Sequence, residues 1–236
     1  MQKLNLTPSF WNRKETIEDF GRSYFLYPGE ANLCRRWFSA DGRFLDLGCG
    51  TGRTTLILHE AQLNVIGIDL SIGMVSRMKR RFPYLQAMAA DATALPFADA
   101  SFDGVLFSYN GLSFIYPMER RKAALSEIHR VLKTGGHFIF SAHNAPGIVF
   151  NLRDRSLRTL SERFFTLPRM FRTGYVYEQK IASTVYYGTV DQTIQELQDA
   201  GFSWVETTDR NGRFGRAIAS WIDPWPYHCF RRGEWQ

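Results

Sequence analysis

A glycine-rich loop is the clearest feature of this 236-residue sequence that could carry chemistry. It runs from Phe44 to Arg53 as FLDLGCGTGR, between an apolar run and a helical pattern. Glycines at such a junction allow a tight turn, positive φ and close approach of the backbone to a ligand. The helix that follows begins with unpaired N–H groups that can bind a carboxylate or a phosphate. By itself the loop is compatible with several nucleotide cofactors.

An acidic residue, Asp69, ends the next apolar run. At the carboxyl end of a second parallel strand, its carboxylate can accept hydrogen bonds from both hydroxyls of a ribose. The alternative is that Asp69 only caps the helix that opens at Ser71, and one residue can do both. A dinucleotide motif needs the spacing G-x-G-x-x-G, but Arg53 stands where the third glycine belongs. The spacing therefore favours a ribose-containing cofactor other than NAD.

The elements that must position these residues follow from hydrophobic periodicity. The expected strands are Arg43–Leu47, Asn64–Ile68, Leu85–Ala89, Gly104–Ser108 and His137–Ser141, with helices at Arg53–Ala61, Ser71–Arg81 and Glu119–Leu132 between them. The strands are apolar on both faces, as parallel strands covered by helices are. We therefore predict an α/β fold: a Rossmann-like, doubly wound, seven-stranded sheet, mostly parallel with an antiparallel last strand, and helices on both faces.

We expect one domain with four parts. Residues 1–40 form an N-terminal helical cover, 41–144 the cofactor-binding core, 145–185 a substrate-lid insertion, and 186–236 a C-terminal helix and two closing strands. The helix is expected at Asp191–Ala200, and the strands at Ser203–Thr208 and Trp225–Arg232. The insertion mixes arginines with aromatic residues between Asn151 and Arg172. It fits either a lid over an anionic or aromatic substrate or a helical cover with a solvated basic face.

Composition limits the class of protein. The formal net charge of +6 permits anionic partners without requiring nucleic acid. Three widely spaced cysteines, without Cys/His ligand spacing, argue against a disulfide framework or a metal site and suit the cytoplasm. No stretch approaches the roughly 18 apolar residues of a membrane span. We expect a cytoplasmic protein that does not span a membrane.

The motifs, taken together, resemble the class I S-adenosylmethionine-dependent methyltransferases, in particular their small-molecule, type 11-like branch. Leu45 to Gly52 is similar to the first motif of that family, and Ile68 to Ser71, with Met74, is similar to the second. The segment Ala90-Asp91-Ala92, followed by Leu95-Pro96-Phe97 and Ser101-Phe102-Asp103, is similar to the third and fourth motifs of the family. Leu132 to Gly136 resembles the turn before the fifth strand, with Thr134 where proline is commoner.

The resemblance implies S-adenosyl-L-methionine as cofactor and S-adenosyl-L-homocysteine as product. It implies that Asp69 holds the ribose, Leu70 packs on the adenine and Asp91 accepts the adenine amino group. The cofactor-binding residues expected on this basis are Asp46, Gly48, Cys49, Gly50, Gly52, Asp69, Leu70, Met74, Asp91, Ala92 and Ser108.

Methyl transfer is an in-line displacement, so the enzyme contributes alignment, desolvation and, for a protonated nucleophile, a base. His143 is the candidate base because it follows the fifth strand at the edge where ligands bind in such sheets. A loop histidine bonded to backbone or water is an equal alternative. Tyr109 and Asn110 are expected either to contact the acceptor or to close the cofactor pocket. The acceptor is expected to be a small molecule, anionic or aromatic, with an O, N or C nucleophile.

Rival functions are an RNA/tRNA or protein methyltransferase, or a non-catalytic cofactor-binding protein of the same fold. Methylation of base amino groups uses an Asn/Asp-Pro-Pro-aromatic turn, whereas this region reads Ser108-Tyr109-Asn110-Gly111. Cytosine C5 methylation needs a nucleophilic cysteine, and none is suitably placed. There is no evident RNA-binding module. The sequence disfavours nucleic acid, and it selects neither a particular acceptor nor an oligomeric state.

Overall fold

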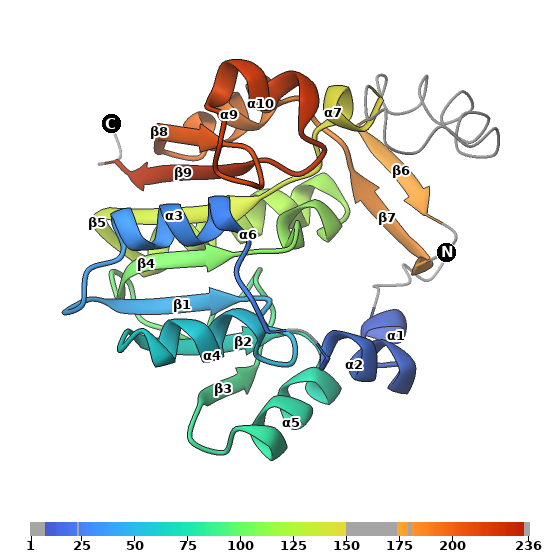
Figure 1. Cartoon of the computed structure of the whole chain (residues 1–236), viewed down its shortest axis with the longest axis vertical. Helices are drawn as coiled ribbons and strands as arrows, with labels where there is room; N and C mark the ends of the chain where they lie inside the picture. Colours follow the sequence, from blue (N-terminus) through green and yellow to red (C-terminus); the bar gives the residue numbers. More distant parts are fainter. Residues whose placement is uncertain (1–7, 23, 150–173, 179–180, 234–236) are drawn as a thin grey trace.

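The structure, a computed structural model, describes residues 8–22, 24–149, 174–178 and 181–233. Its main sheet has seven strands in the order β3-β2-β1-β4-β5-β9-β8 (Figure 1). The strands are β1 Arg43–Leu47, β2 Asn64–Asp69, β3 Gln86–Ala89, β4 Phe102–Phe107, β5 Leu132–Ser141, β8 Phe202–Thr208 and β9 Tyr227–Arg232. Only β9 runs against its neighbours, β5 and β8, so the predicted, mostly parallel sheet with an antiparallel last strand is confirmed.

Helices cover both faces of the sheet, as predicted. One face carries α3 Pro28–Trp37, α4 Arg53–Glu60 and α5 Ile72–Arg81, and the other carries α6 Met118–Val131 and α9 Val190–Asp199. Figure 1 shows α3 and α4 in front of the strands and α6 behind them. The side chains of β1 alternate accordingly, with Phe44 packed against the α3 side and Leu45 against the α6 side. Burial on both faces explains why the strands are apolar throughout.

Most element boundaries differ from the expected ones by one or two residues, and two of the differences have a reason visible in the backbone. The expected turn at residues 133–136 lies inside β5, because Phe102 pairs with Leu132 and Gly104 with His137, which leaves residues 133–136 opposite Asp103 alone. The last strand begins at Tyr227 rather than Trp225. Pro226 precedes it and has no N–H to donate to a sheet.

Short elements at the carboxyl ends of the parallel strands were not anticipated in detail. They are α1 Pro8–Trp11, α2 Lys14–Phe20, η1 Gly111–Phe114, α7 Ala145–Val149, β6 Tyr175–Glu178, β7 Ser183–Tyr186 and α10 Arg216–Ile222. The strands β6 and β7 pair antiparallel as a separate two-stranded sheet. In Figure 1, α1 and α2 lie at the edge toward which the arrows of β1 and β4 point, as do β6 and β7.

Much of the expected lid insertion, including residues 150–173 with its arginines, lies outside the described residues. Within the described part, no helix is long and apolar enough to cross a membrane.

Candidate active site

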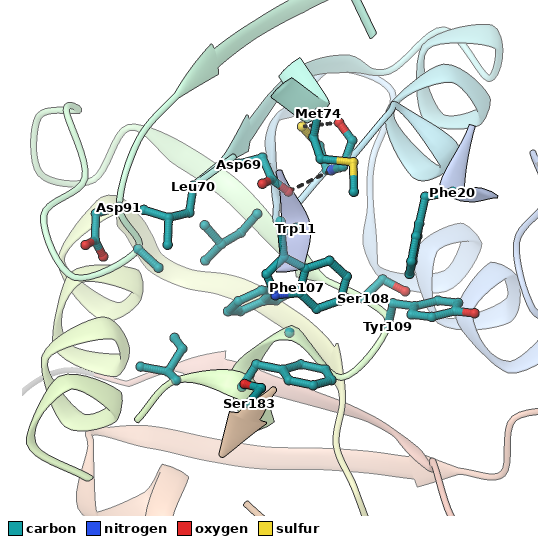
Figure 2. Close-up of a pocket in the computed structure, with 18 of the residues that line it drawn as sticks. Trp11, Phe20, Asp69, Leu70, Met74, Asp91, Phe107, Ser108, Tyr109 and Ser183 are labelled. Carbon is teal, nitrogen blue, oxygen red and sulfur yellow. Dashed lines mark hydrogen bonds between the residues drawn. The ribbon is translucent and has the colours of Figure 1, made fainter. Parts of the chain in front are cut away.

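A cavity of about 1200 Å³ opens at the carboxyl ends of the parallel strands. It lies where β2 and β4 flank β1, the place where strand order reverses and where open α/β sheets bind ligands. Its walls come from the glycine loop, the segments after β2, β3 and β4, the N-terminal helices and β7. Figure 2 shows Asp91 and Leu70 toward one end, Ser108, Tyr109 and Phe20 toward the other, and Trp11 and Phe107 between them.

The glycine loop bends over the end of β1 through left-handed residues. Gly48, Gly50 and Gly52 have φ values of 71°, 55° and 95°, a region that suits glycine. The N–H groups of Gly48 and Cys49 donate to the carbonyl of Ile68, at 2.8 and 2.9 Å, which ties the loop to β2. A Cβ on Gly50 would have no heavy atom within 4 Å, so its open side allows a ligand to approach the backbone.

Asp69 has two connections within the loop region and also faces the cavity. Its Oδ2 accepts from the N–H of Gly50 at 2.9 Å (Figure 2). Its Oδ1 accepts from the N–H of Ser71 at 2.7 Å. Burial raises the pKa of Asp69, and these two hydrogen bonds oppose the rise. Each carboxylate oxygen can accept a second hydrogen bond. Asp69 therefore caps the turn before α5 and still presents an acceptor to the cavity.

Asp91 follows β3, beside the end of β2, and lies toward the same end of the cavity as Leu70 (Figure 2). Its Oδ1 accepts from the N–H and the hydroxyl of Thr93, at 2.9 and 2.8 Å, and its Oδ2 pairs with Arg120 at 2.6 Å. Partial burial acts to raise its pKa, but the bonds from Thr93 and Arg120 outweigh burial, and the pKa of Asp91 lies below its ordinary value. The carboxylate is thus ionised and fixed in orientation.

Seven further expected residues lie at different depths around these two acids. Leu70 is 51% exposed and lines the cavity, as do Met74, Ala92 and the Gly48–Gly50 loop. Gly52 does not line it and begins α4, where a Cβ would come within 3.0 Å of Met78. The thiol of Cys49 points inward, 3.9 Å from the sulfur of Met78, and burial raises its pKa. The loop therefore offers the cavity mainly backbone.

Asp46 lies beneath the loop rather than in the cavity wall. Its Oδ2 accepts from the hydroxyls of Thr54 and Thr55, each at 2.5 Å, and its buried Oδ1 has no hydrogen-bond partner among the described residues. Burial raises the pKa of Asp46 to about 6, and the two threonines oppose the rise. In this position Asp46 supports the start of α4 from below.

The expected catalytic residues are divided between the cavity and the layer behind it. Tyr109 lines the cavity, as does Ser108, which was expected to bind the cofactor, whereas Asn110 and His143 do not. The N–H of Asn110 donates to Ser141 Oγ at 2.9 Å. The ring of His143 packs edge-on against Phe114, with centroids 5.7 Å apart, and its buried Nδ1 has no hydrogen-bond partner within the described part of the chain. Burial, assisted by the charge of Arg121, lowers the pKa of His143 to about 3.

Several residues of the site carried no sequence signal strong enough to select them. Trp11 and Phe20 of the N-terminal helices line the cavity and contact each other with ring centroids 5.5 Å apart. Tyr24, by contrast, packs on Phe82 outside the cavity wall. Glu30 is fully buried and forms an ion pair with Arg53. The sequence predicts a helical cover at residues 1–40, but it does not show which side chains of that cover point into the cavity.

Comparison with known proteins identifies methyltransferases as the relatives of this chain. Residues 44–136 match the family model described as "Methyltransferase domain". A demethylmenaquinone methyltransferase of Renibacterium salmoninarum is 33% identical over 177 residues, with 72% of this chain and 70% of the relative covered. A ubiquinone/menaquinone biosynthesis C-methyltransferase of Campylobacter jejuni is 29% identical, with coverage of 72% and 74%. The structure of the CcbJ methyltransferase of Streptomyces caelestis is 15% identical, with a TM-score of 0.70 and coverage of 95% and 98%.

A Rossmann-like sheet of this strand order, with a glycine loop and an acid at the end of β2, defines a class I methyltransferase fold. The chain belongs to the S-adenosylmethionine-dependent methyltransferases. The residues fit that cofactor: Gly50 leaves open space beside the backbone, Asp69 has a carboxylate that could accept hydrogen bonds from a ribose, and Asp91 has one that could accept from an amine. Within the described part of the chain, no cluster of three or more His, Cys, Asp or Glu side chains is placed to hold a metal ion.

Proposed function

We propose that the methyl acceptor is a small aromatic ring of the quinol type and that the methyl group goes to a ring carbon. The observation that carries this proposal is the aromatic wall of the cavity beyond the glycine loop. That wall includes Trp11, Phe20, Phe107, Tyr109, Phe114 and Tyr116. Flat rings pack favourably against such side chains, edge-on or offset. The names of the relatives from Renibacterium salmoninarum and Campylobacter jejuni, which mention menaquinone and ubiquinone, point to the same class of acceptor.

Charge in the cavity supports an aromatic acceptor over an anionic one. Two arginines are the cationic side chains among the described lining residues. Arg53 pairs with Glu30 at 3.0 Å, and Arg120 pairs with Asp91 at 2.6 Å. An anion would have to compete with a carboxylate already in place, which makes these arginines poor anchors for it.

The chemistry asks little of the protein beyond alignment. When bound, S-adenosylmethionine supplies a methyl group on a positively charged sulfur. The aromatic wall would hold the ring in line with that methyl and exclude water. A ring carbon that received this methyl group would still carry its own proton, and loss of that proton to a base would restore aromaticity. A weak base is sufficient for that last step.

The roles of the catalytic candidates follow from their positions and charges. We propose that Tyr109, whose pKa is raised mainly by burial, stays neutral and donates a hydrogen bond to a ring oxygen. His143 remains the proposed proton acceptor. With a pKa of about 3 it is neutral and weakly basic at pH 7. Because it lies behind Phe114, that ring would have to turn aside to let the proton reach it. Asn110 would shape the turn between them.

The test is methyl transfer from labelled S-adenosylmethionine to a short-chain naphthoquinol, a simple phenol, an aryl carboxylate and an amine. We expect label on a ring carbon of the naphthoquinol, identified by mass spectrometry. Trp11→Ala should raise the KM for that quinol about tenfold, from the loss of roughly 1.4 kcal/mol of ring contact. Trp221→Ala, on the exposed surface of α10, is the matched control. Exclusive methylation of the carboxylate or the amine would overturn the proposal.

A further inference from the structure

An ion pair with a fully buried carboxylate lies at the end of the cavity formed by Ser108 and Tyr109, where Arg53 lines the cavity and Glu30 lies behind it. Glu30 of α3 has no exposed side-chain surface, and Arg53, at the start of α4, is 12% exposed. The contact is bidentate, with Arg53 Nη1 3.0 Å from Oε2 and Nη2 3.1 Å from Oε1 of Glu30. Burial opposes the charge of Arg53, but the adjacent Glu30 raises the pKa of Arg53 above its usual value. The pair joins the N-terminal cover to the glycine-loop helix.

Such a pair is a poor source of stability, because desolvation of two charges offsets most of their attraction. A fully buried glutamate is also rare. The pair is better explained by the geometry that it fixes. Each terminal nitrogen of Arg53 has a second acceptor: Nη1 donates to the carbonyl of Phe25 at 2.6 Å, and Nη2 donates to Ser108 Oγ at 2.7 Å.

Ser108, the first residue after β4, is held from three sides. Its Oγ accepts the hydrogen bond from Arg53 and donates its own proton to Oε1 of Glu30. The hydroxyl of Tyr227, in β9, lies 3.4 Å away. A serine hydroxyl has one proton and two lone pairs, so this hydroxyl has no capacity left for a ligand. Although Ser108 borders the cavity, its hydroxyl therefore serves to connect Glu30, Arg53 and Tyr227 rather than to bind a ligand.

The turn that follows Ser108 needs such support. Tyr109 and Asn110 are consecutive non-glycine residues with left-handed φ values of 56° and 60°. Backbone strain of this kind persists where the surroundings determine it and is concentrated at functional sites. The guanidinium carbon of Arg53 lies 5.5 Å from the ring centroid of Tyr109. The ring centroids of Tyr109 and Phe20 are 5.6 Å apart. Figure 2 shows Ser108, Tyr109 and Phe20 together at this end of the cavity.

We infer that Glu30, Arg53 and Ser108 are positioning residues that hold the turn after β4 in its left-handed form and thereby shape the cavity end beside the glycine loop. They act through Tyr109 and the backbone of the turn rather than by contact with the transferred methyl. The inference does not depend on the identity of the acceptor.

The test compares two variants with a matched control. Glu30→Gln removes the buried charge, and Ser108→Ala removes the hydroxyl but leaves the ion pair intact. Glu127→Gln is the control, because Glu127 forms a bidentate pair with Arg130, at 2.7 Å to Nε and 2.9 Å to Nη2, and neither residue lines the cavity. Binding of S-adenosylhomocysteine is measured by calorimetry, and protection of the turn by hydrogen–deuterium exchange of peptides that cover residues 108–112.

We expect both variants to weaken binding of S-adenosylhomocysteine at least tenfold and to speed exchange in the turn, while Glu127→Gln changes neither. Thermal unfolding separates these effects from general destabilisation, which Glu30→Gln and Glu127→Gln should share. If Glu30→Gln fails to fold, Ser108→Ala decides the matter. Wild-type affinity and wild-type exchange in Ser108→Ala would show the network to be structural only and would overturn the inference.

Discussion

Single side chains in this enzyme often combine a structural and a ligand-facing role. Asp69 caps the turn into α5 through Ser71, fixes Gly50 of the loop and still lines the cavity. Two carboxylate oxygens with four lone pairs make that combination possible. Ser108 shows the opposite case, since its hydroxyl is fully used inside the protein. A polar side chain that lines a cavity can therefore be assigned a hydrogen bond to a ligand only if it still has a free donor or acceptor.

Replacing Asp69 by alanine should weaken binding of S-adenosylhomocysteine at least tenfold. The reason is the loss of a charged hydrogen bond to ribose, about 1.4 kcal/mol or more. Calorimetry on the folded variant measures the effect. Asp103→Ala is the matched control, since Asp103 likewise accepts a backbone N–H, from Arg43 at 2.9 Å, but at the amino end of the strands. Equal affinities of wild type and Asp69→Ala would refute the ribose role.

Among the elements, the N-terminal helices and α5 are fastened together beside the cavity. Ser71 is the N-cap of α5, and its Oγ accepts from the N–H of Met74 at 3.1 Å. The same hydroxyl lies 2.7 Å from Oδ1 of Asn12, between α1 and α2. Trp11 belongs to α1 and Phe20 to α2, and both line the cavity. The Ser71 cap of α5 therefore also helps to hold these two aromatic residues at the cavity.

Ser71→Ala should therefore affect stability and binding together. Loss of the cap is expected to lower the free energy of unfolding by about 1 kcal/mol. A looser cover should also weaken binding of S-adenosylhomocysteine severalfold. Thr189→Ala removes the equivalent N-cap of α9, where Thr189 Oγ1 accepts from the N–H of Gln192 at 3.1 Å, away from the main cavity. In urea unfolding, Thr189→Ala should lose a similar amount of stability, while its affinity for S-adenosylhomocysteine stays unchanged. Equal affinities of the two variants would contradict the proposal that Ser71 fastens the N-terminal helices to α5.

Over the whole molecule, buried titratable groups make stability depend on pH. Burial lowers the pKa of His228 to about 3, from an ordinary value of 6.5, and burial with the charge of Arg121 does the same for His143. The unfolded chain takes up these protons near pH 6.5 and the folded chain does not, so their stabilisation is complete above pH 6.5 and is lost as the pH falls toward 3. Asp46 opposes them, because its pKa of about 6 favours the folded state on acidification.

Two histidines outweigh one aspartate, so we expect a net loss of stability between pH 7 and pH 5. His228→Asn should be less stable than wild type at pH 7, because it leaves space in the core. Its further loss on going to pH 5 should be about 2 kcal/mol smaller than that of wild type. Urea unfolding at both pH values measures this difference, with His59→Asn on the exposed surface of α4 as the control. An undiminished loss in His228→Asn would show that another group carries the pH dependence.

The sequence by itself determined the sheet, the helices on both faces and the place of the glycine loop, because these depend on local periodicity and on backbone freedom at Gly48, Gly50 and Gly52. It also located Asp69 and Asp91, since each ends a strand or follows one closely. The tertiary structure decided what surrounds them: the pairing of Glu30 with Arg53, the entry of Trp11 and Phe20 into the cavity, and the position of His143 behind Phe114. These contacts join residues far apart in the chain, and the orientation of a side chain in such a contact is set by packing rather than by spacing in the sequence.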